Sequence, residues 1–520
     1  MNNKIIIDKK DASKFILSPQ TLYGERFLDS NLSYHVEGYK FNPKFKSGVW
    51  DGKIHFFSQA RHECYLGLWD EVINLLRKQK FDLEFRWKFQ KRRIRPDTLD
   101  KWLSENSPFE LRYYQREAFI EGVINRRLCI EIPTSGGKTI LIYLFAKYFF
   151  QEENKKVLII VPKVQLVEQT YSEFFELKPF VGRVYALYKE EDKPILISTW
   201  QSLQKKKKYF FKQFDVLIID EAHTVKADVL KKICEKCENA WDRIGLSGTY
   251  PNKKYAQYWS IVASIGPVKR FVTYEELVEN DFISDFTIKT YLLLYPNNYV
   301  QKFDYVVDSL KKIHSSPKTL KIAQYNLEQD FAFFSGIRLT FLISLFRKLK
   351  KNAIFLFSKR EYGQTLYNLF QKWNNGKQIY YIDGTVKVSD REFFKKQMEE
   401  NDNVVIIASF GTFSEGINIK NVHYIIFCNS YKSKIRIIQS IGRGLRKFQN
   451  KKAIIIDLVD VFKDSKYFPN IIFKHFKNRE KYYKDYKMNY EIKRVFLSDY
   501  EEKSRKIFNS NESPFFLTVD

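Results

Sequence analysis

Residues 133–139 read Pro-Thr-Ser-Gly-Gly-Lys-Thr, the residue types of a loop that binds phosphate groups. Small residues let backbone N–H groups approach a phosphate, a lysine reaches the β- and γ-oxygens of a nucleotide, and a hydroxyl ligates Mg²⁺. The helix expected to begin here adds the positive end of its dipole. The match to G-x-x-x-x-G-K-[ST] is partial because Ile132 replaces the first glycine, and the alternative is an ordinary glycine turn. The candidate nucleotide-binding residues are Thr134, Ser135, Gly136, Gly137, Lys138 and Thr139.

A second candidate segment is Asp-Glu-Ala-His at residues 220–223, directly after the largely apolar residues 214–219. We predict that this run is a strand of a parallel sheet, and ligands gather at the carboxyl ends of such strands. One carboxylate there can hold Mg²⁺ while its neighbour orients the attacking water. Thr139 and Asp220 are therefore the candidate Mg²⁺ ligands, and Glu221 is the candidate base. His223 can equally be a structural partner of the turn.

A third candidate segment, residues 439–446, reads Gln-Ser-Ile-Gly-Arg-Gly-Leu-Arg. Arg443 and Arg446 are three residues apart, so in a helix they share one face. If they face an ATP bound elsewhere in the fold, they can neutralise charge on the transferred phosphoryl group, an effect that contributes about 10³–10⁵ in rate. The alternative is a surface pair of salt-bridging arginines.

Short apolar runs alternate with helical segments around these candidates, which predicts mostly parallel sheets covered on both faces. The expected strands of the first half are residues 127–132, 157–162, 194–199 and 214–220. The pattern restarts near Asn352, with expected strands at residues 353–358, 378–383, 404–409, 424–429 and 453–458. We therefore predict an α/β protein with two parallel-sheet lobes in tandem, residues 101–290 and 291–460. The second range includes a helical stretch, residues 295–349, expected to link the lobes, and residues 461–520 are expected to form basic C-terminal helices.

Residues 1–100 are expected to form a small basic α/β domain. Its most distinctive stretch is residues 38–57, where turn signals flank short aromatic segments and predict strands and hairpins. A helix is expected at residues 68–80, followed by a strand in Phe-Asp-Leu-Glu-Phe-Arg-Trp-Lys-Phe. The basic residues are Lys44, Lys46, Lys53, Arg92, Arg93 and Arg95. With aromatic residues interleaved, they favour a nucleic-acid-binding surface over a merely solvated one.

The chain of 520 residues carries 88 Lys+Arg against 61 Asp+Glu, a formal net charge of +27. Such a field favours a polyanionic partner, and nucleic acid is the commonest one, although a lysine-rich composition also arises in AT-rich genomes. No signal peptide is visible at the start, and no apolar run approaches the ~20 residues of a membrane helix. Five cysteines are few for this length and indicate a reducing compartment. Cys234 and Cys237 form one C-x-x-C, which alone is a weak metal signal.

The motifs occur in the order found in superfamily 2 helicases, which this chain resembles. They are Leu-Arg-Tyr-Tyr-Gln ending at Gln115, the phosphate loop, residues 161–169, residues 197–203, Asp-Glu-Ala-His, residues 246–249, residues 408–418 and residues 439–446. Within that superfamily the chain is most similar to the UvsW helicases of T-even-type bacteriophages. That likeness covers about residues 30–460 and includes Tyr-Lys-Phe-Asn-Pro-Lys-Phe-Lys-Ser-Gly-Val-Trp-Asp-Gly-Lys-Ile in the leading domain.

The resemblance implies roles for matching residues. It implies two RecA-like lobes, with Gln115 reading adenine through its amide, Lys138 and Thr139 holding phosphate and Mg²⁺, and Asp220 and Glu221 acting as above. Further residues whose roles are implied are Ser247 and Thr249 in coupling hydrolysis to movement, Glu415 and Gly416 in sensing nucleotide and backbone, and Arg443 and Arg446 as arginine fingers with Gln439 beside them. Residues 161–169 and 197–203 resemble segments that grip phosphates of a strand. Ser135 departs from the glycine of many helicases, and we expect activity to survive it.

The expected protein is thus an ATP- and Mg²⁺-dependent DNA helicase or translocase. By family likeness it acts on branched DNA (stalled forks, Holliday junctions, D-loops and R-loops) in recombination, repair and replication. The expected partners are single-stranded, duplex and branched DNA and the RNA of R-loops, with no membrane; the expected state is a monomer in the host cytoplasm. Three alternatives remain at this point: an RNA helicase, the motor subunit of a restriction system, and a basic DNA-binding protein with an inactive ATP site.

Overall fold

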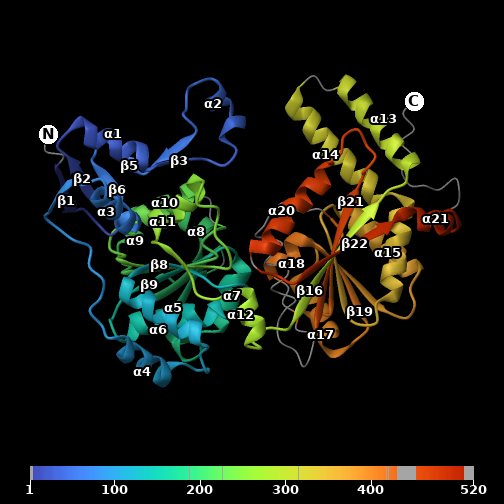
Figure 1. Ribbon diagram of the computed structural model, residues 1–520. Helices are drawn as coiled ribbons and strands as arrows, with labels where there is room; N and C mark the ends of the chain where they lie inside the picture. The colour runs from blue at the N-terminus through green and yellow to red at the C-terminus, as the bar shows by residue number, and fades with distance from the viewer. Residues whose placement is uncertain are drawn as a thin grey trace. The chain divides into compact units, whose positions relative to one another are not determined.

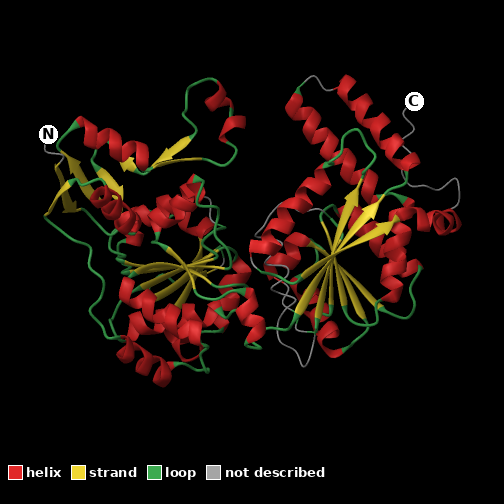
Figure 2. Cartoon of the chain, in the orientation of Figure 1, coloured by secondary structure: helices red, strands yellow, loops and turns green. Residues whose placement is uncertain are grey.

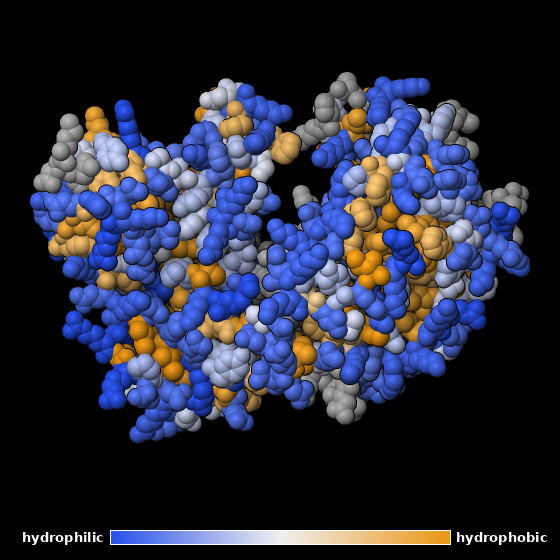
Figure 3. All heavy atoms as spheres, in the orientation of Figure 1, coloured by the Kyte–Doolittle hydropathy of each residue, from blue (hydrophilic) through white to orange (hydrophobic). Residues whose placement is uncertain are grey.

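The computed structural model describes residues 4–186, 188–224, 227–313, 316–416, 419, 421–429, 452–485 and 487–508. The chain divides into two units, Met1–Thr273 and Tyr274–Asp520 (Figure 1). The first unit contains a small leading domain and one parallel sheet, and the second contains another parallel sheet (Figure 2). Hydrophilic side chains cover much of the visible face of each unit (Figure 3).

The leading domain is built on a five-stranded sheet. Its strands, in spatial order, are β5 (Phe57–Ser58), β6 (Glu63–Tyr65), β2 (Lys14–Pro19), β1 (Lys4–Lys9) and β7 (Asp82–Phe85). β1 pairs antiparallel with β2 and parallel with β7. Alternate residues of β1 and β2, including Ile5, Ile7, Phe15 and Leu17, are buried, as a strand with one covered face requires. Helices α1 (Leu22–Asn31) and α3 (Trp69–Lys78) contribute apolar faces to the same core.

The prediction of strands and hairpins in residues 38–57 is only partly correct. β4 (Lys53–His55) pairs with β3 (Ser33–His35), but a 3-10 turn (Tyr39–Phe41) and α2 (Pro43–Lys46) lie between them. The reason is local: the Asn42 side chain accepts a hydrogen bond from the backbone N–H of Lys44 at 3.0 Å, and a proline is tolerated at the first position of a helix. The Tyr39 ring packs on Phe45 at 4.8 Å rather than across a sheet.

The first lobe has an eight-stranded sheet. Its strands, in spatial order, are β11 (Tyr188–Lys189), β10 (Val181–Tyr185), β12 (Ile195–Thr199), β9 (Val157–Val161), β13 (Val216–Asp220), β14 (Asp242–Ser247), β8 (Arg127–Glu131) and β15 (Val268–Arg270). Its helices are α4 (Pro96–Asn106), α5 (Tyr113–Asn125), α6 (Lys138–Gln151), α7 (Val164–Ser172), α8 (Trp200–Gln204), α9 (Lys208–Phe211), α10 (Ala227–Lys236) and α11 (Ala256–Ser264), with a 3-10 helix at Phe175–Phe180. All pairings are parallel except β10 with β11, and helices cover both faces (Figure 1). The four predicted strands of this lobe are confirmed.

The leading domain and the first lobe share one hydrophobic core, which runs from Ile5 through Leu66 to Val262. At its centre Arg243, fully buried, donates from Nη2 to the Ser13 hydroxyl at 2.7 Å and to the carbonyls of Cys234 and Cys237 at 2.9 Å each. The C-x-x-C segment therefore contributes backbone acceptors here, and its two thiols are buried.

A second buried cluster corrects the expectation that Arg92 belongs to a DNA-contacting surface. Arg92 donates to Asp242 at 2.5 Å and to Glu153 at 2.8 Å, and only 11% of its side chain is exposed. Asp242 also accepts from Lys155 at 2.8 Å. Burial alone raises the pKa of Asp242, but the Arg92 and Lys155 charges outweigh it, so its pKa is lowered and the carboxylate stays charged. Arg92 thus fastens the connection between the leading domain and the lobe.

The second unit contains a seven-stranded parallel sheet. Its strands, in spatial order, are β18 (Gln378–Ile382), β19 (Val404–Ser409), β17 (Ala353–Phe357), β20 (Tyr424–Phe427), β21 (Ala453–Val461), β16 (Phe286–Leu294) and β22 (Tyr490–Phe496). Its described helices are α12 (Tyr274–Glu279), α13 (Asn297–Ile313), α14 (Pro317–Phe333), α15 (Gly336–Lys348), α16 (Arg360–Lys372), α17 (Val388–Glu400), α18 (Phe410–Gly416), α20 (Ile471–Asp485) and α21 (Glu501–Phe508). The five predicted strands are confirmed. The expectation that residues 295–349 link the two lobes is wrong, because helices α13 to α15 connect β16 and β17, two strands of this one sheet. Besides its helices, the C-terminal segment supplies the edge strand β22.

Two buried ion pairs hold the second unit together. Arg338 donates to Asp460 at 2.7 Å and to the Cys428 carbonyl at 2.7 Å, joining α15 to the ends of β20 and β21. Arg479 of α20 donates to Asp457 of β21 at 2.9 Å. Both arginines are fully buried, so their neighbours must replace the water that would otherwise solvate them.

Within the described ranges no single helix is long and apolar enough to cross a membrane. The consecutive segments Thr319–Phe333 and Gly336–Lys348, bent by 53°, meet that test jointly by length and composition.

We expect Arg243→Ala to destabilise the first unit by about 3 kcal/mol or more, because several buried oxygen acceptors lose their donor at once. Urea unfolding followed by tryptophan fluorescence measures this effect. Arg77→Ala, at an exposed position near the end of α3, is the control and should leave the midpoint almost unchanged. Equal midpoints for the two variants would show that the Arg243 hydrogen bonds do not hold the leading domain on the lobe.

Candidate functional site

The loop of residues 132–137 joins the carboxyl end of β8 to the start of α6. Ser135 and Gly137 have φ angles of +69° and +82°, and the Gly136 N–H donates to the Pro133 carbonyl at 3.0 Å. A Cβ on Gly136 would lie 2.4 Å from the Cγ2 of Ile132, the residue that replaces the first glycine of the usual pattern. The side chain of the buried Ile132 therefore leaves room only for glycine at position 136.

Residues at the start of α5 hold this loop through its carbonyl groups. The Tyr114 hydroxyl and the Gln115 Nε2 both donate to the Gly136 carbonyl, at 2.8 and 3.1 Å. Arg112 donates to the Tyr114 hydroxyl at 2.8 Å, and its backbone N–H donates to the Gln115 Oε1 at 3.0 Å. Each polar atom of the Gln115 amide thus has one protein partner, which fixes the side chain beside the loop and leaves a second hydrogen and a second lone pair.

Lys138 and the carboxylates of the second segment converge at the carboxyl edge of the sheet. The Lys138 Nζ lies 3.6 Å from Glu221 Oε1 and donates to the Ile132 carbonyl at 3.4 Å. Asp220 is the last residue of β13, and its Oδ1 accepts from the Glu221 N–H at 2.9 Å. Glu221 has a φ of +46°, a conformation that L residues seldom adopt, so the chain turns sharply directly after the strand.

His223 connects this turn to the end of β14. Its Nδ1 lies 2.6 Å from the Ser247 hydroxyl and 3.3 Å from Glu221 Oε2. The Ser247 hydroxyl donates to the Thr249 carbonyl at 2.6 Å, so Ser247 accepts from a protonated Nδ1. Burial lowers the pKa of His223, which favours the neutral form of the ring. The sequence left His223 between a catalytic and a structural role, and the structure makes it a link between Glu221 and residues 247–249.

The residues present fit a magnesium nucleotide. Among the described residues, the hydroxyls of Thr134 and Thr249 and the Nε2 of His223 are buried without a hydrogen-bond partner. An ideal Cβ at Gly248 would lie 3.4 Å from the Thr134 hydroxyl, so the segment after β14 approaches the phosphate loop closely. An ammonium group, unpaired hydroxyls and adjacent carboxylates are the groups that bind phosphate oxygens and a hard divalent cation.

In the second unit, Gly416 is the predicted nucleotide-binding residue that the structure describes. Gly416 is the last residue of α18, which follows β19. Gln439, Arg443 and Arg446 lie outside the described residues, so their roles remain predictions.

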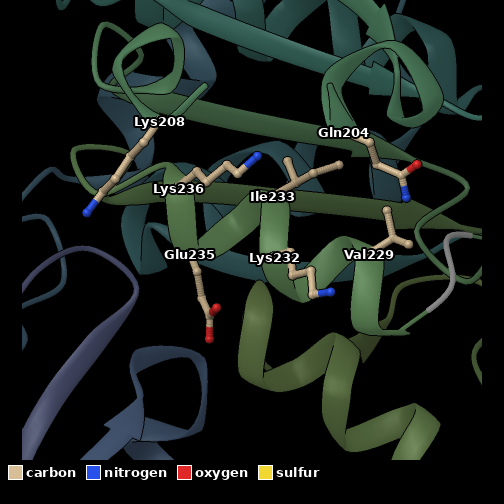
Figure 4. A pocket seen from close by; sticks show the side chains of 7 residues that line it. All are labelled: Gln204, Lys208, Val229, Lys232, Ile233, Glu235 and Lys236. Atoms are coloured by element: carbon tan, nitrogen blue, oxygen red, sulfur yellow. The ribbon is translucent and has the colours of Figure 1, made fainter. Parts of the chain in front are cut away.

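A separate hollow of about 330 Å³ lies between α10 and helices α8 and α9. Figure 4 shows Gln204 and Lys208 of α8 and α9 opposite α10. Most of its charged groups already have partners: Lys208 pairs with Glu238, Lys236 donates to the Lys206 carbonyl at 2.9 Å, and Glu235 accepts from the Tyr65 hydroxyl at 2.6 Å. This hollow is therefore a packing feature beside the leading domain.

Three family models match the chain in consecutive segments. "DNA helicase UvsW, N-terminal" matches residues 20–86, "Type III restriction enzyme, res subunit" matches residues 108–252, and "Helicase conserved C-terminal domain" matches residues 338–447. The ATP-dependent DNA helicase uvsW of Enterobacteria phage T4 is 29% identical over 502 residues, which are 89% of this chain and 94% of that protein. The chain is a UvsW-type helicase of superfamily 2. It is accordingly an ATP-dependent DNA helicase.

The chain is also similar to a curated translocase and to solved structures. The DNA 3'-5' translocase XPB2 of Sulfurisphaera tokodaii is 23% identical over 372 residues, 67% of this chain and 81% of that protein. The crystal structure of T4 UvsW is 26% identical and superposes with a TM-score of 0.48, covering 95% of this chain and 100% of that chain. The type ISP restriction-modification enzyme LlaBIII bound to DNA is 15% identical with a TM-score of 0.55, covering 77% of this chain and 32% of that chain, and it shares the fold alone.

Sequence reasoning missed two residues that support the helicase site, Arg112 and Tyr114. Both lie in the Leu-Arg-Tyr-Tyr-Gln segment from which only Gln115 was singled out. Their signal was available, since a polar aromatic residue and an arginine beside a glycine-rich loop are suitable donors to its carbonyls.

We expect Gly137→Ala to weaken ATP binding by the helicase at least tenfold. An alanine Cβ would lie 2.2 Å from the Gln115 Nε2, and the φ of +82° disfavours any L residue. Binding of a fluorescent ATP analogue measures the effect. Gly384→Ala is the control, because a Cβ there meets no atom within 4 Å. Unchanged affinity in Gly137→Ala would show that the loop tolerates a different conformation.

Proposed function

We propose that this helicase uses ATP hydrolysis at the Lys138–Glu221 site to remodel branched DNA: forks, Holliday junctions, D-loops and R-loops, in recombination, repair and replication. The observation that carries the proposal is that the nucleotide-site lobe shares its core with a leading domain of the UvsW N-terminal type. A DNA contact made by that domain therefore moves together with the site of hydrolysis.

In the proposed chemistry, Lys138 binds the phosphate oxygens, and the loop residues 134–137 surround them with backbone N–H groups. Thr139 and Asp220 would hold Mg²⁺, which neutralises phosphate charge when bound. Glu221 orients the attacking water and accepts its proton. Gln115 uses its second hydrogen and lone pair for adenine.

The remaining roles follow the family pattern. Arg443 and Arg446 stabilise charge on the transferred phosphoryl group, with Gln439 beside them. Gly416 belongs to the segment that senses nucleotide. His223 carries the state of Glu221 to Ser247, since its Nδ1 lies within 3.3 Å of both side chains. The motor contacts the phosphate groups of DNA. The affinity for DNA therefore depends on the structure of the DNA and on salt concentration rather than on base sequence.

The ATPase rate with different nucleic acids tests the proposal. We expect strong stimulation by forked and single-stranded DNA, weaker stimulation by duplex, and none by RNA alone. Glu221→Gln should keep ATP affinity and lower turnover by about 10²–10⁴, because the water loses its base. Glu105→Gln, an exposed carboxylate of α4, is the matched control. Stimulation by RNA alone contradicts the choice of DNA, and near-normal turnover in Glu221→Gln removes that residue from catalysis.

The loop between β3 and β4 is the proposed branched-DNA contact of the leading domain. Lys44 and Lys46 are exposed there beside Phe41, whose side chain is 73% exposed. Basic side chains with accessible aromatic rings suit a nucleic-acid surface.

We expect Lys44→Glu combined with Lys46→Glu to weaken fork binding and to reduce the slope of log K against log salt by about 2, because each phosphate contact contributes about 0.9. Fluorescence anisotropy over a salt series measures both. The control pair is Lys78→Glu with Lys80→Glu, exposed at the end of α3. Substitution is preferable to deleting residues 1–100, since deletion would open the shared core. A slope equal to that of the control would make this loop structural.

A further inference from the structure

A cleft of about 670 Å³ lies where the leading domain meets the first lobe, away from the nucleotide site. One wall comes from residues 86–90, which follow β7, together with Lys9 at the end of β1. The other wall comes from Arg126 and Trp241, the residues directly before β8 and β14. The nucleotide site lies at the opposite, carboxyl ends of these strands. A strand of five or six residues spans roughly 16–20 Å, so the two sites are separate.

Two indoles dominate the cleft. Trp87 and Trp241 have ring centroids 5.8 Å apart at an interplanar angle of 55°, so they form neighbouring walls rather than a closed stack. Trp69, which does not line the cleft, packs against Trp87 with ring centroids 5.5 Å apart, edge to face. Both cleft indoles are partly exposed. Rings that are supported on one side and open on the other are platforms on which a flat ligand can stack.

Four cations surround these rings. The structure describes all eight residues that line the cleft, and none of them carries a carboxylate. Lys9 lies with its Nζ 5.0 Å from the Trp241 centroid. Arg86 contacts Glu84 at 3.1 Å, but 57% of its side chain remains exposed. Lys88 is exposed, and Arg126 shares Asp242 with other cations, so its charge is only partly neutralised. The cleft therefore attracts an anion that also carries flat rings.

The walls are fixed before any ligand arrives. The N–H groups of Arg86 and Trp87 both donate to the Ile7 carbonyl, at 2.9 and 3.3 Å, which continues the pairing of β7 with β1. On the lobe side the Arg126 N–H donates to the Gly122 carbonyl at 3.1 Å. The two domains are joined by their common core, so the walls belong to one unit. A preformed site loses little conformational entropy on binding.

We propose that this cleft binds unpaired nucleotides of a DNA single strand, with bases on Trp87 and Trp241 and phosphates on Lys9, Arg86, Lys88 and Arg126. Single-stranded nucleic acid is the anion with accessible ring faces, because the bases of a duplex are already stacked on one another. The volume lies within the ~300–1,000 Å³ typical of small-molecule sites, which suits one or a few nucleotides and not a duplex. The site adds a strand contact to the phosphate grip of the motor.

Equilibrium binding of a fluorescent oligothymidylate without ATP tests this proposal on the full chain. Lys9→Glu with Lys88→Glu changes two exposed side chains, and Lys78→Glu with Lys80→Glu is the control of equal charge. We expect the cleft pair alone to weaken single-strand binding about tenfold and to reduce the salt slope by roughly 1.4, from about 0.7 per contact. Basal ATPase activity without DNA should be unchanged in both.

Photo-cross-linking supplies an independent readout, since it uses the unmodified protein. An oligothymidylate containing 5-iodouracil should cross-link to peptides containing Trp87 or Trp241. The proposal is overturned if cross-links fall only elsewhere, if both variant pairs bind alike, or if the cleft pair weakens duplex binding equally. If Glu221→Gln loses DNA-stimulated ATP hydrolysis but still binds oligothymidylate, strand binding by the cleft does not depend on the proposed motor function. The two proposals can therefore fail separately.

Discussion

The guanidinium of Arg243 is fully buried, and oxygen atoms from three parts of the first unit replace the water around it. Besides Ser13, Cys234 and Cys237, it donates to the carbonyls of Ala240 at 3.0 Å and Ser264 at 2.8 Å. Removing such a charge from water costs several kcal/mol unless its donors are satisfied. The leading domain, the end of α10 and the end of α11 must therefore stay together, because separation would leave the charge without partners.

Strand β14, which contains Arg243, also reaches the candidate nucleotide site at its other end. Arg243 is the second residue of β14, and Ser247, bonded to His223, is its last. Hydrogen-bonded strands on both sides keep β14 from stretching or sliding. The leading domain is thus attached at the amino end of a rigid element whose carboxyl end touches the candidate nucleotide site. A ligand bound rigidly to that domain therefore has a fixed relation to the candidate nucleotide site.

Much of this fold was predictable because hydrophobic periodicity and turn-forming residues are local features of the sequence. Each expected strand of the two lobes is a short apolar run, and buried parallel strands need such runs irrespective of their partners. The positions of the phosphate loop and of residues 220–223 were predictable for a similar reason. Lys138 and Glu221 each follow a strand, and parallel strands bring their carboxyl ends to one edge of the sheet. The 3.6 Å between their side chains confirms that they meet.

The parts that were not predictable depend on partners distant in sequence. Arg92 appears among exposed basic residues in the sequence, yet its partner Asp242 is 150 positions away. Residues 38–57 have the composition of a hairpin, but Asn42 caps a helical turn and the aromatic rings pack on each other. No periodicity distinguishes a buried arginine from an exposed one, since both are single cations in a polar context.

This distinction changes how the net charge of +27 is understood. Arg127, Arg243, Arg338 and Arg479 are all buried, so they set the geometry of the interior and cannot contact DNA. The whole charge still contributes to the long-range field that draws a polyanion toward the protein. On our proposals, contact comes from exposed side chains such as Lys44 of α2 or Lys88. The buried arginines, with their planar fork of donors, serve where several acceptors must be held in fixed directions. The buried arginines therefore serve the architecture, and the salt dependence of binding reports on exposed cations, Arg86 and Lys88 among them.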